Sequence, residues 1–133
     1  MRYLSEIMEN RQTNLFNKNK VFFAFSNKQF ESGIIEKKIP KLTKIVNIGQ
    51  GMFCPSDNVK EVIEQIDIIY KESIVEDMKQ GKDNVILREL SNHECFYTGD
   101  ITDCVEKLSD YPITKKEIIK VYRKNYNKMT EWY

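Results

Sequence analysis

The 133-residue sequence contains no apolar run long enough to cross a bilayer, and it has no excess of charge of one sign. Lys and Arg total 21 against 20 Asp and Glu, so the formal net charge is +1. This balance excludes a bulk polycation and a bulk mimic of nucleic acid. The hydrophobic fraction of 41% is too high for a wholly disordered chain. The length, close to that of a typical domain, predicts a single compact domain over residues 1–133.

Cysteine is also scarce. The three cysteines are odd in number and have no Cys-x-x-Cys spacing, which excludes the usual patterns of a disulfide framework and of a paired zinc site. The first six residues turn acidic before the apolar core of a signal peptide can form. We therefore expect a cytoplasmic location and three free thiols at Cys54, Cys95 and Cys104.

Short β-branched and aromatic stretches predict a small sheet, with strands over residues 21–25, 42–48 and 52–54. Longer periodic stretches predict helices, with Thr114 as the N-cap of the last one, and Ser26 is expected to cap a one-turn helix that ends at Gly33. Thr114 and Glu117 together form a capping box at the start of the last helix. The pattern indicates an α+β fold, in which a small antiparallel sheet of about three strands packs against a long central helix and a C-terminal helix.

The clearest helical periodicity runs over residues 57–80. At 100° per residue its apolar side chains share one sector and its carboxylates the other, as in an amphipathic helix. The predicted buried sector consists of Val59, Val62, Ile63, Ile66, Ile69, Tyr70, Ser73 and Ile74. Ile68 and Val75 break the rule, since they lie in the middle of the acidic face. Such residues are either covered by another element of the chain or form part of a partner interface. We favour the interface and predict that a partner binds this face, through Glu61, Glu64, Ile68, Glu72 and Val75.

The near-neutral total conceals blocks of opposite sign. Residues 18–44 carry a net +5 and residues 111–133 a net +4, whereas residues 56–78 carry −5 and residues 94–110 carry −4. The basic blocks support an alternative hypothesis, nucleic-acid binding. Its candidate contacts are Lys37, Lys38, Lys41, Lys44, Lys120, Arg123 and Lys124. Aromatic residues of the last helix, Trp132 among them, lie on its apolar face and are more typical of a core than of a base-stacking platform.

His93 is the only histidine, so a second alternative is a small enzyme organised around it. No oxyanion-hole or orienting signature accompanies His93, and a histidine that caps or holds the segment 91–100 is the simpler interpretation. His93, Cys95, Asp100 and Cys104 lack the paired spacing of a zinc site, so no metal is expected. The Gly49-Gln50-Gly51 segment lacks the Lys-Ser/Thr of a phosphate loop and predicts a plain turn. No cofactor is expected.

Three segments of the chain suggest a family. Val21–Phe30, Asn47–Phe53, and Leu90–Glu94 with Thr98–Asp100 resemble a family of small, uncharacterised proteins from phages and prophages of A/T-rich Gram-positive or related bacteria. The resemblance implies a small accessory gene of a mobile element. It also implies that the chain could act as an inhibitor of bacterial defence, as anti-CRISPR proteins do. It assigns no functional residues.

These observations favour a non-enzymatic inhibitor or adaptor that binds a host protein, one candidate partner being a CRISPR effector. No membrane partner is expected. Nucleic-acid binding and an enzyme centred on His93 stay open as alternatives. Self-association through the stripe of Ile68 and Val75 is also open.

Overall fold

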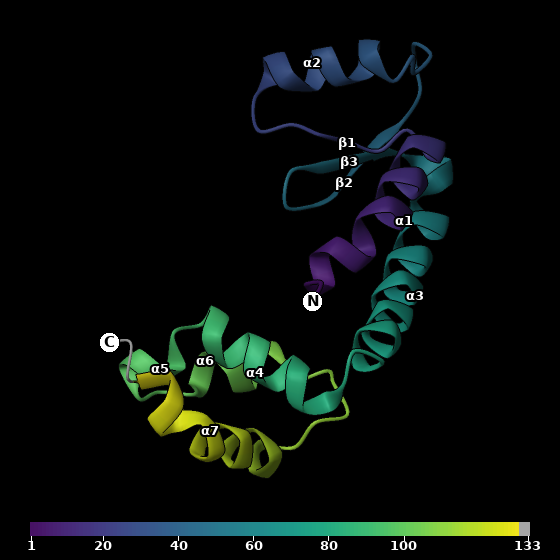
Figure 1. The fold of residues 1–133 in the computed structure, drawn as a ribbon. Helices are drawn as coiled ribbons and strands as arrows, with labels where there is room; N and C mark the ends of the chain where they lie inside the picture. Colours follow the sequence, from purple (N-terminus) through teal and green to yellow (C-terminus); the bar gives the residue numbers. More distant parts are fainter. Residues whose placement is uncertain (131–133) are drawn as a thin grey trace. The chain divides into compact units, whose positions relative to one another are not determined.

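The computed structural model describes residues 1–130 and confirms the α+β class (Figure 1). Trp132 lies outside the described residues. The elements are α1 (Leu4–Lys18), β1 (Phe22–Phe23), α2 (Asn27–Glu36), β2 (Ile45–Gly49), β3 (Met52–Pro55), the 3₁₀ turn η1 (Ser56–Asn58), α3 (Val59–Met78), α4 (Lys82–Asn92), α5 (Cys95–Thr98), α6 (Thr102–Lys107) and α7 (Lys115–Thr130).

The chain divides into two compact units. Residues 2–73 form one, which holds the sheet, and residues 74–133 together with Met1 form the other, which is helical in its described part. α3 runs from the first unit into the second. The organisation into a single domain stays a prediction.

Local capping explains where two of the helices begin. Ser26 is the N-cap of α2, and its side-chain oxygen accepts a hydrogen bond from the Gln29 N–H. At the start of α7 the Glu117 N–H donates to Thr114 Oγ1 over 3.2 Å, and the Thr114 N–H donates to Glu117 Oε1 over 2.9 Å. This is the predicted capping box, in which two otherwise unpaired amides are satisfied reciprocally.

The three strands form an antiparallel sheet in the order β1-β3-β2. β3 is therefore central, and β1 is an edge strand of only two residues, shorter than the predicted 21–25. The turn between β2 and β3 has positive φ at Gly49, Gln50 and Gly51. As predicted, it is a plain turn, and its handedness suits a tight hairpin.

Each face of the sheet has its own apolar cluster. On one face Phe22, Ala24 and Ile39 pack with residues of α2 such as Phe30 and Ile34. On the other face Val21, Cys54 and Val62 pack with Phe16 of α1 and with Val59 and Ile66 of α3. The sheet thus lies between α2 on one side and α1 with α3 on the other (Figure 1). This confirms the packing of the long central helix on the sheet.

In the helical unit, α4 contacts α5, α6 and α7, and α5 also contacts α7. Phe96 of α5 stacks on Tyr122 of α7, with ring centroids 5.2 Å apart and planes 11° apart. Within this unit α7 contacts α4 and α5. Its apolar side chains Ile118 and Val121 are buried, as are Val85, Ile86 and Leu90 of α4. The packing of α7 against the sheet, which lies in the other unit, stays a prediction.

Candidate functional site

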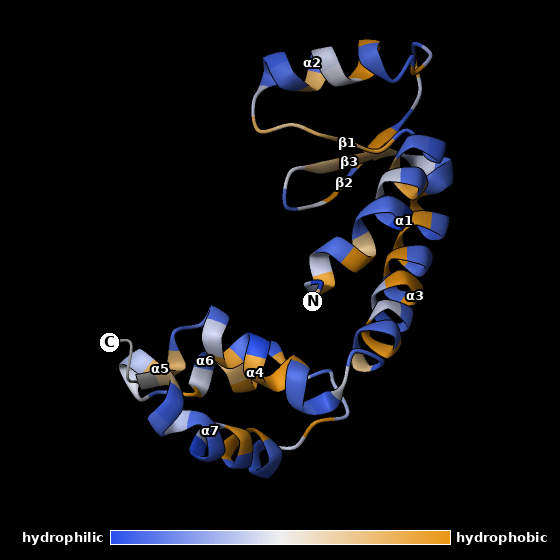
Figure 2. Cartoon of the chain, in the orientation of Figure 1, coloured by the Kyte–Doolittle hydropathy of each residue, from blue (hydrophilic) through white to orange (hydrophobic). Residues whose placement is uncertain are grey.

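The outer face of α3 carries the predicted partner-binding residues. Ile68 is 40% exposed and Val75 is 61% exposed, so in the described part of the chain neither is fully covered by another element. Glu64 and Glu72 are exposed as well, and Glu61 is partly buried. Figure 2 shows that apolar and polar residues alternate along this helix. These residues define what we call the α3 face: Glu61, Glu64, Ile68, Glu72 and Val75.

Two of the carboxylates on this face are already paired. Lys18 Nζ lies 2.8 Å from Glu61 Oε1, and Arg11 Nη2 lies 3.1 Å from Glu72 Oε1, so α1 supplies both cations. Exposed pairs of this kind contribute little to stability. They do reduce the negative charge that the sequence suggested for this helix. Within the described part of the chain, Glu64 has no such partner and remains the free carboxylate of the α3 face.

Ile63 differs from the prediction. The periodicity placed it in the buried sector of α3, but its side chain is 53% exposed. At 100° per residue it lies nearly opposite Glu61 and Glu72, the residues that α1 contacts. The apolar side of α3 is therefore wider than the part of it that neighbouring elements cover. Ile63 lies at the edge of this apolar side, outside the covered part.

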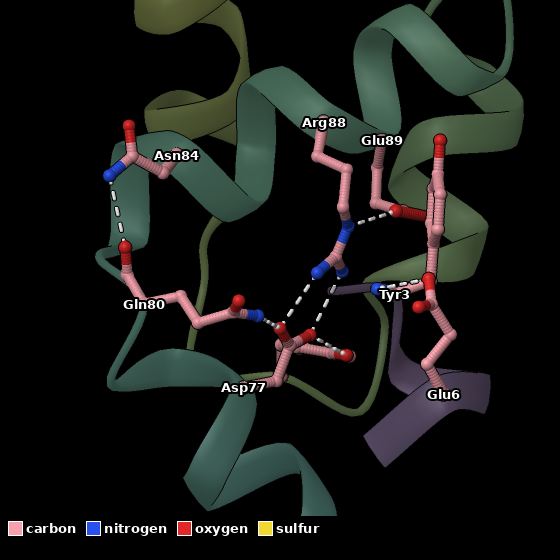
Figure 3. A network of polar contacts seen from close by, with 8 residues as sticks. Tyr3, Glu6, Asp77, Gln80, Asn84, Arg88 and Glu89 are labelled. Atoms are coloured by element: carbon pink, nitrogen blue, oxygen red, sulfur yellow. Dashed lines mark hydrogen bonds and ion pairs between the residues drawn. The ribbon is translucent and has the colours of Figure 1, made fainter. Parts of the chain in front are cut away.

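A buried polar cluster joins the end of α3 to α4, and Figure 3 shows its central residues. Arg88 donates from Nη1 and Nη2 to the two carboxylate oxygens of Asp77. Gln80 Nε2 and Tyr111 Oη also donate to Asp77, each over 2.6 Å. Arg88 Nε donates to Glu89 Oε2 over 2.7 Å. The Asp77 carboxylate thus accepts four hydrogen bonds although its side chain is fully buried.

These hydrogen bonds shift the pKa values of Asp77 and Tyr111. Burial by itself would raise the pKa of Asp77, but hydrogen bonds from Arg88, Tyr111 and Gln80 outweigh it and hold the pKa of this carboxyl below its ordinary value. Burial and the neighbouring Asp77 carboxylate raise the pKa of Tyr111. Asp77 therefore stays charged and Tyr111 stays protonated at neutral pH. Neither Asp77 nor Tyr111 is therefore poised for proton transfer near pH 7, and their hydrogen bonds serve to hold the cluster together.

Sequence reasoning missed this cluster. Asp77 resembles the solvent-facing carboxylates that precede it on α3, and Arg88 lies eleven residues further on in another helix. The signal that could have found the pair is Gly81, which follows the end of α3 at Met78 and, with a φ of 104°, is the N-cap of α4. A tight turn at that point brings the last turn of one helix beside the second turn of the next.

His93 is the C-cap of α4, and its backbone N–H donates to the Glu89 carbonyl over 3.1 Å. This agrees with the interpretation of His93 as a residue at the end of a helix. Its Nε2 lies 3.8 Å from Glu89 Oε1 and is buried without a hydrogen bond. Across residues 1–130, no three side chains of His, Cys, Asp or Glu come together in a group that could hold a metal ion.

The cysteines are three free thiols, as predicted, and the structure shows that all three are fully buried. Burial raises the pKa of each of them, that of Cys104 to about 12. A thiol with a raised pKa is a poor nucleophile, because the thiolate is the reactive form. In this state, none of the three has the ionisation of an activated catalytic cysteine.

The basic residues of the nucleic-acid hypothesis fall into two groups. Lys37, Lys38, Lys41 and Lys44 follow α2 in the unit of the sheet, and Lys37 Nζ donates to Asn17 Oδ1 over 3.1 Å. Lys120, Arg123 and Lys124 are exposed on α7 in the helical unit. The aromatic residue behind them, Tyr122, is stacked on buried Phe96, which fits the interpretation of this face as core.

The comparison with known proteins gives a family. A model described as a family of unknown function matches residues 4–129, nearly the whole chain. The chain belongs to the family of unknown function DUF7659. Neither a curated protein nor a solved structure matches it. Membership of DUF7659 assigns no activity, so origin in a phage and inhibition of a host defence stay predictions. Among the described residues, no helix is long and apolar enough to cross a membrane.

Proposed function

We propose that the protein is a non-enzymatic inhibitor or adaptor of phage or prophage type, which binds a host protein through the α3 face. The observation that carries this proposal is the exposure of Ile68 and Val75 among carboxylates on one helix. Isolated exposed apolar residues are common on protein surfaces. Two of them seven residues apart share one side of a helix, so they offer a partner two anchors on one line.

The chemistry of the α3 face defines the partner. An apolar strip bordered by Glu64, Glu61 and Glu72 suits a shallow apolar surface surrounded by Lys and Arg. Such charge complementarity speeds association and selects against acidic partners. Enzymes that bind nucleic acid carry basic channels of this kind. The resemblance to phage proteins makes a CRISPR effector in the bacterial cytoplasm the first candidate.

The experiment starts with the full chain as bait in a lysate of the bacterial host, followed by mass spectrometry and purification of the captured protein. Binding of that protein is then measured by calorimetry for the native chain, Ile68→Glu and Val75→Glu. Ile63→Glu is the matched control, because it introduces the same charge at an exposed apolar residue on another side of α3. We expect Ile68→Glu and Val75→Glu each to weaken binding about tenfold or more, and Ile63→Glu to leave it unchanged.

Retention of the native melting temperature by each variant shows that any loss of binding is local. Undiminished affinity in both Ile68→Glu and Val75→Glu would overturn the proposal. An equal loss in Ile63→Glu would also contradict it, because the effect would then come from added negative charge and not from the α3 face.

Nucleic-acid binding is the second candidate, and the exposure of Lys120, Arg123 and Lys124 on α7 supports it. If the protein binds nucleic acid through these residues, its affinity for plain DNA or RNA should fall steeply as the salt concentration rises, since phosphate contacts release counterions. Replacement of these three residues by Gln should then remove the salt dependence. The native chain showing no affinity at low salt would exclude this candidate.

A further inference from the structure

The free edge of β1 opens into a groove of about 740 Å³. Its lining includes Phe16 and Asn17 from α1, Phe22 and Phe23 from β1, and Ser32 and Glu36 from α2. α1 and α2 cover opposite faces of the sheet, so a groove lined by both must pass around the edge of the strand. β1 pairs with β3 on one side only, which leaves the groove at its unpaired side.

The backbone of Phe23 points into that unpaired side. Ala24 lies opposite Gly51 and donates to its carbonyl over 2.8 Å, and Phe22 lies opposite Phe53 in the same register. Alternate residues of an antiparallel strand direct their N–H and C=O to opposite sides. The backbone groups of Phe23 therefore face away from β3.

The backbone N–H groups on either side of Phe23 along this edge already donate hydrogen bonds within the chain. The Val21 N–H donates to the Phe16 carbonyl over 2.9 Å, and the Phe25 N–H donates to Gln29 Oε1 over 2.7 Å. Between them, Phe23 lies in the non-hydrogen-bonded pair with Met52, so its N–H receives no partner from β3. An edge with one open donor and acceptor, set in a groove, is the arrangement that receives an added strand.

The side chains around the groove describe the segment that would fit. Phe23 is 51% exposed and contacts Phe16 edge to face, with ring centroids 5.9 Å apart, so one apolar surface is open beside the edge. Lys28 and Lys37 line the groove against a single carboxylate, Glu36. Lys37 is held by the neutral Asn17 amide, and Lys28 has no ion pair within the described part of the chain. The block of residues 18–44 that contains them has a net charge of +5.

We propose that this groove binds an extended, acidic peptide segment of a partner protein, which adds to the free edge of β1 beside Phe23. The segment donates one backbone hydrogen bond to the Phe23 carbonyl and accepts one from the Phe23 N–H. Its apolar side chain rests on Phe16 and Phe23, and its carboxylates lie near Lys28 and Lys37. This proposal does not depend on the α3 face.

The test uses the full chain, labelled with ¹⁵N, and a heptapeptide in which valine alternates with aspartate as the probe. We expect titration to shift the amide resonances of Phe23 and Lys28 and to slow hydrogen exchange at Phe23. The same peptide with N-methylated valines should bind about tenfold more weakly, since it lacks the donor for the Phe23 carbonyl. A heptapeptide of valine and lysine should not bind. These peptide comparisons leave the protein unchanged, so they stand whatever a variant does to folding.

Two pairs of variants locate the contact. Phe23→Pro removes the N–H and Phe23→Ala keeps it, so we expect Phe23→Pro to lose more affinity than Phe23→Ala. Lys28→Glu should weaken binding of the acidic peptide about tenfold. Lys41→Glu introduces the same charge change outside the groove and should have little effect.

Equal binding of the N-methylated and unmodified peptides would overturn the proposal, because the groove would then hold side chains without strand pairing. Equal binding of the acidic and basic peptides would also overturn it. Self-association of the free chain that Phe23→Pro abolishes, measured by sedimentation, would assign the edge to a second copy of this chain instead.

Discussion

Arg88 binds Asp77 through two parallel hydrogen bonds, from Nη1 to Oδ1 over 2.7 Å and from Nη2 to Oδ2 over 2.9 Å. Both side chains are almost wholly buried. The planar guanidinium matches the carboxylate, which makes the pair charge-assisted and directional. The pair fixes α4 on the end of α3, on either side of the turn at Gly81. Removing Arg88 would leave the buried Asp77 carboxylate without its cation, and removing Asp77 would take two hydrogen-bond acceptors from the buried Arg88 guanidinium.

Asp77→Asn should therefore lower the free energy of unfolding by about 3–5 kcal/mol, the usual cost of breaking a buried ion pair from one side. Urea denaturation followed by circular dichroism measures this. Asp83→Asn is the control, because Asp83 is exposed in the first turn of α4 and its loss should cost about 0.5 kcal/mol or less. Equal stability of the two variants would contradict a structural role for the pair.

The depressed pKa of Asp77 makes stability depend on pH in the acid range. Because the carboxyl is more acidic in the folded chain than in the unfolded chain, its contribution is fully present above the unfolded value of about 4 and is lost as pH falls through the folded value. Asp77→Asn should thus flatten the fall of the unfolding free energy below about pH 4. Some slope should remain, since a hydrogen bond from Lys82 lowers the pKa of Glu117 to about 2. An unchanged slope in Asp77→Asn would refute this assignment.

Gly33 allows α2 to approach β1 closely. A Cβ at this position would overlap the ring of Phe22. Gly33→Ala should destabilise the chain by about 1–3 kcal/mol through overpacking, even after the gain in helix propensity of about 1 kcal/mol. Ser32→Ala, one residue earlier and exposed, is the control and should be neutral or stabilising. Thermal denaturation distinguishes them, and a Gly33→Ala variant as stable as the native chain would show that α2 can move away from β1.

The three thiols should resist modification in the folded chain. Cys54, Cys95 and Cys104 are buried, and burial raises the pKa of each, so few thiolates are present or accessible at neutral pH. Iodoacetamide followed by intact-mass measurement should add no label under native conditions and three labels in denaturant. Rapid labelling of Cys104 in the native chain would contradict the burial of α6 against α4.

Local chemistry made several elements predictable from the sequence. The box of Thr114 and Glu117 fixes the start of α7 because both partners lie within one turn. Ile68 and Val75 could be recognised as unusual because they interrupt an otherwise regular acidic face, although the pattern also allowed another element of the chain to cover them. Such features can be predicted from the sequence, since each depends on residues only a few positions apart.

Contacts between elements were not predictable in the same way. The pairing of Asp77 with Arg88 depends on the turn at Gly81, and the exposure of Ile63 depends on where α1 lies beside α3. The open edge at Phe23 required the strand order β1-β3-β2, because a sequence of three strands is also compatible with β1 in the centre. Helix faces were thus predictable, whereas the partners of those faces and the edges of the sheet were not.

The brevity of β1 has a consequence for assembly. Two residues of strand, flanked by edge donors that the fold itself occupies at Val21 and Phe25, can order only a short stretch of an incoming chain. A long sheet cannot grow from such an edge, because the incoming strand runs out of partners within a few residues. A strand held by so few bonds also leaves readily. The shortness of β1 would therefore favour reversible exchange of partners and would protect the chain against fibre formation.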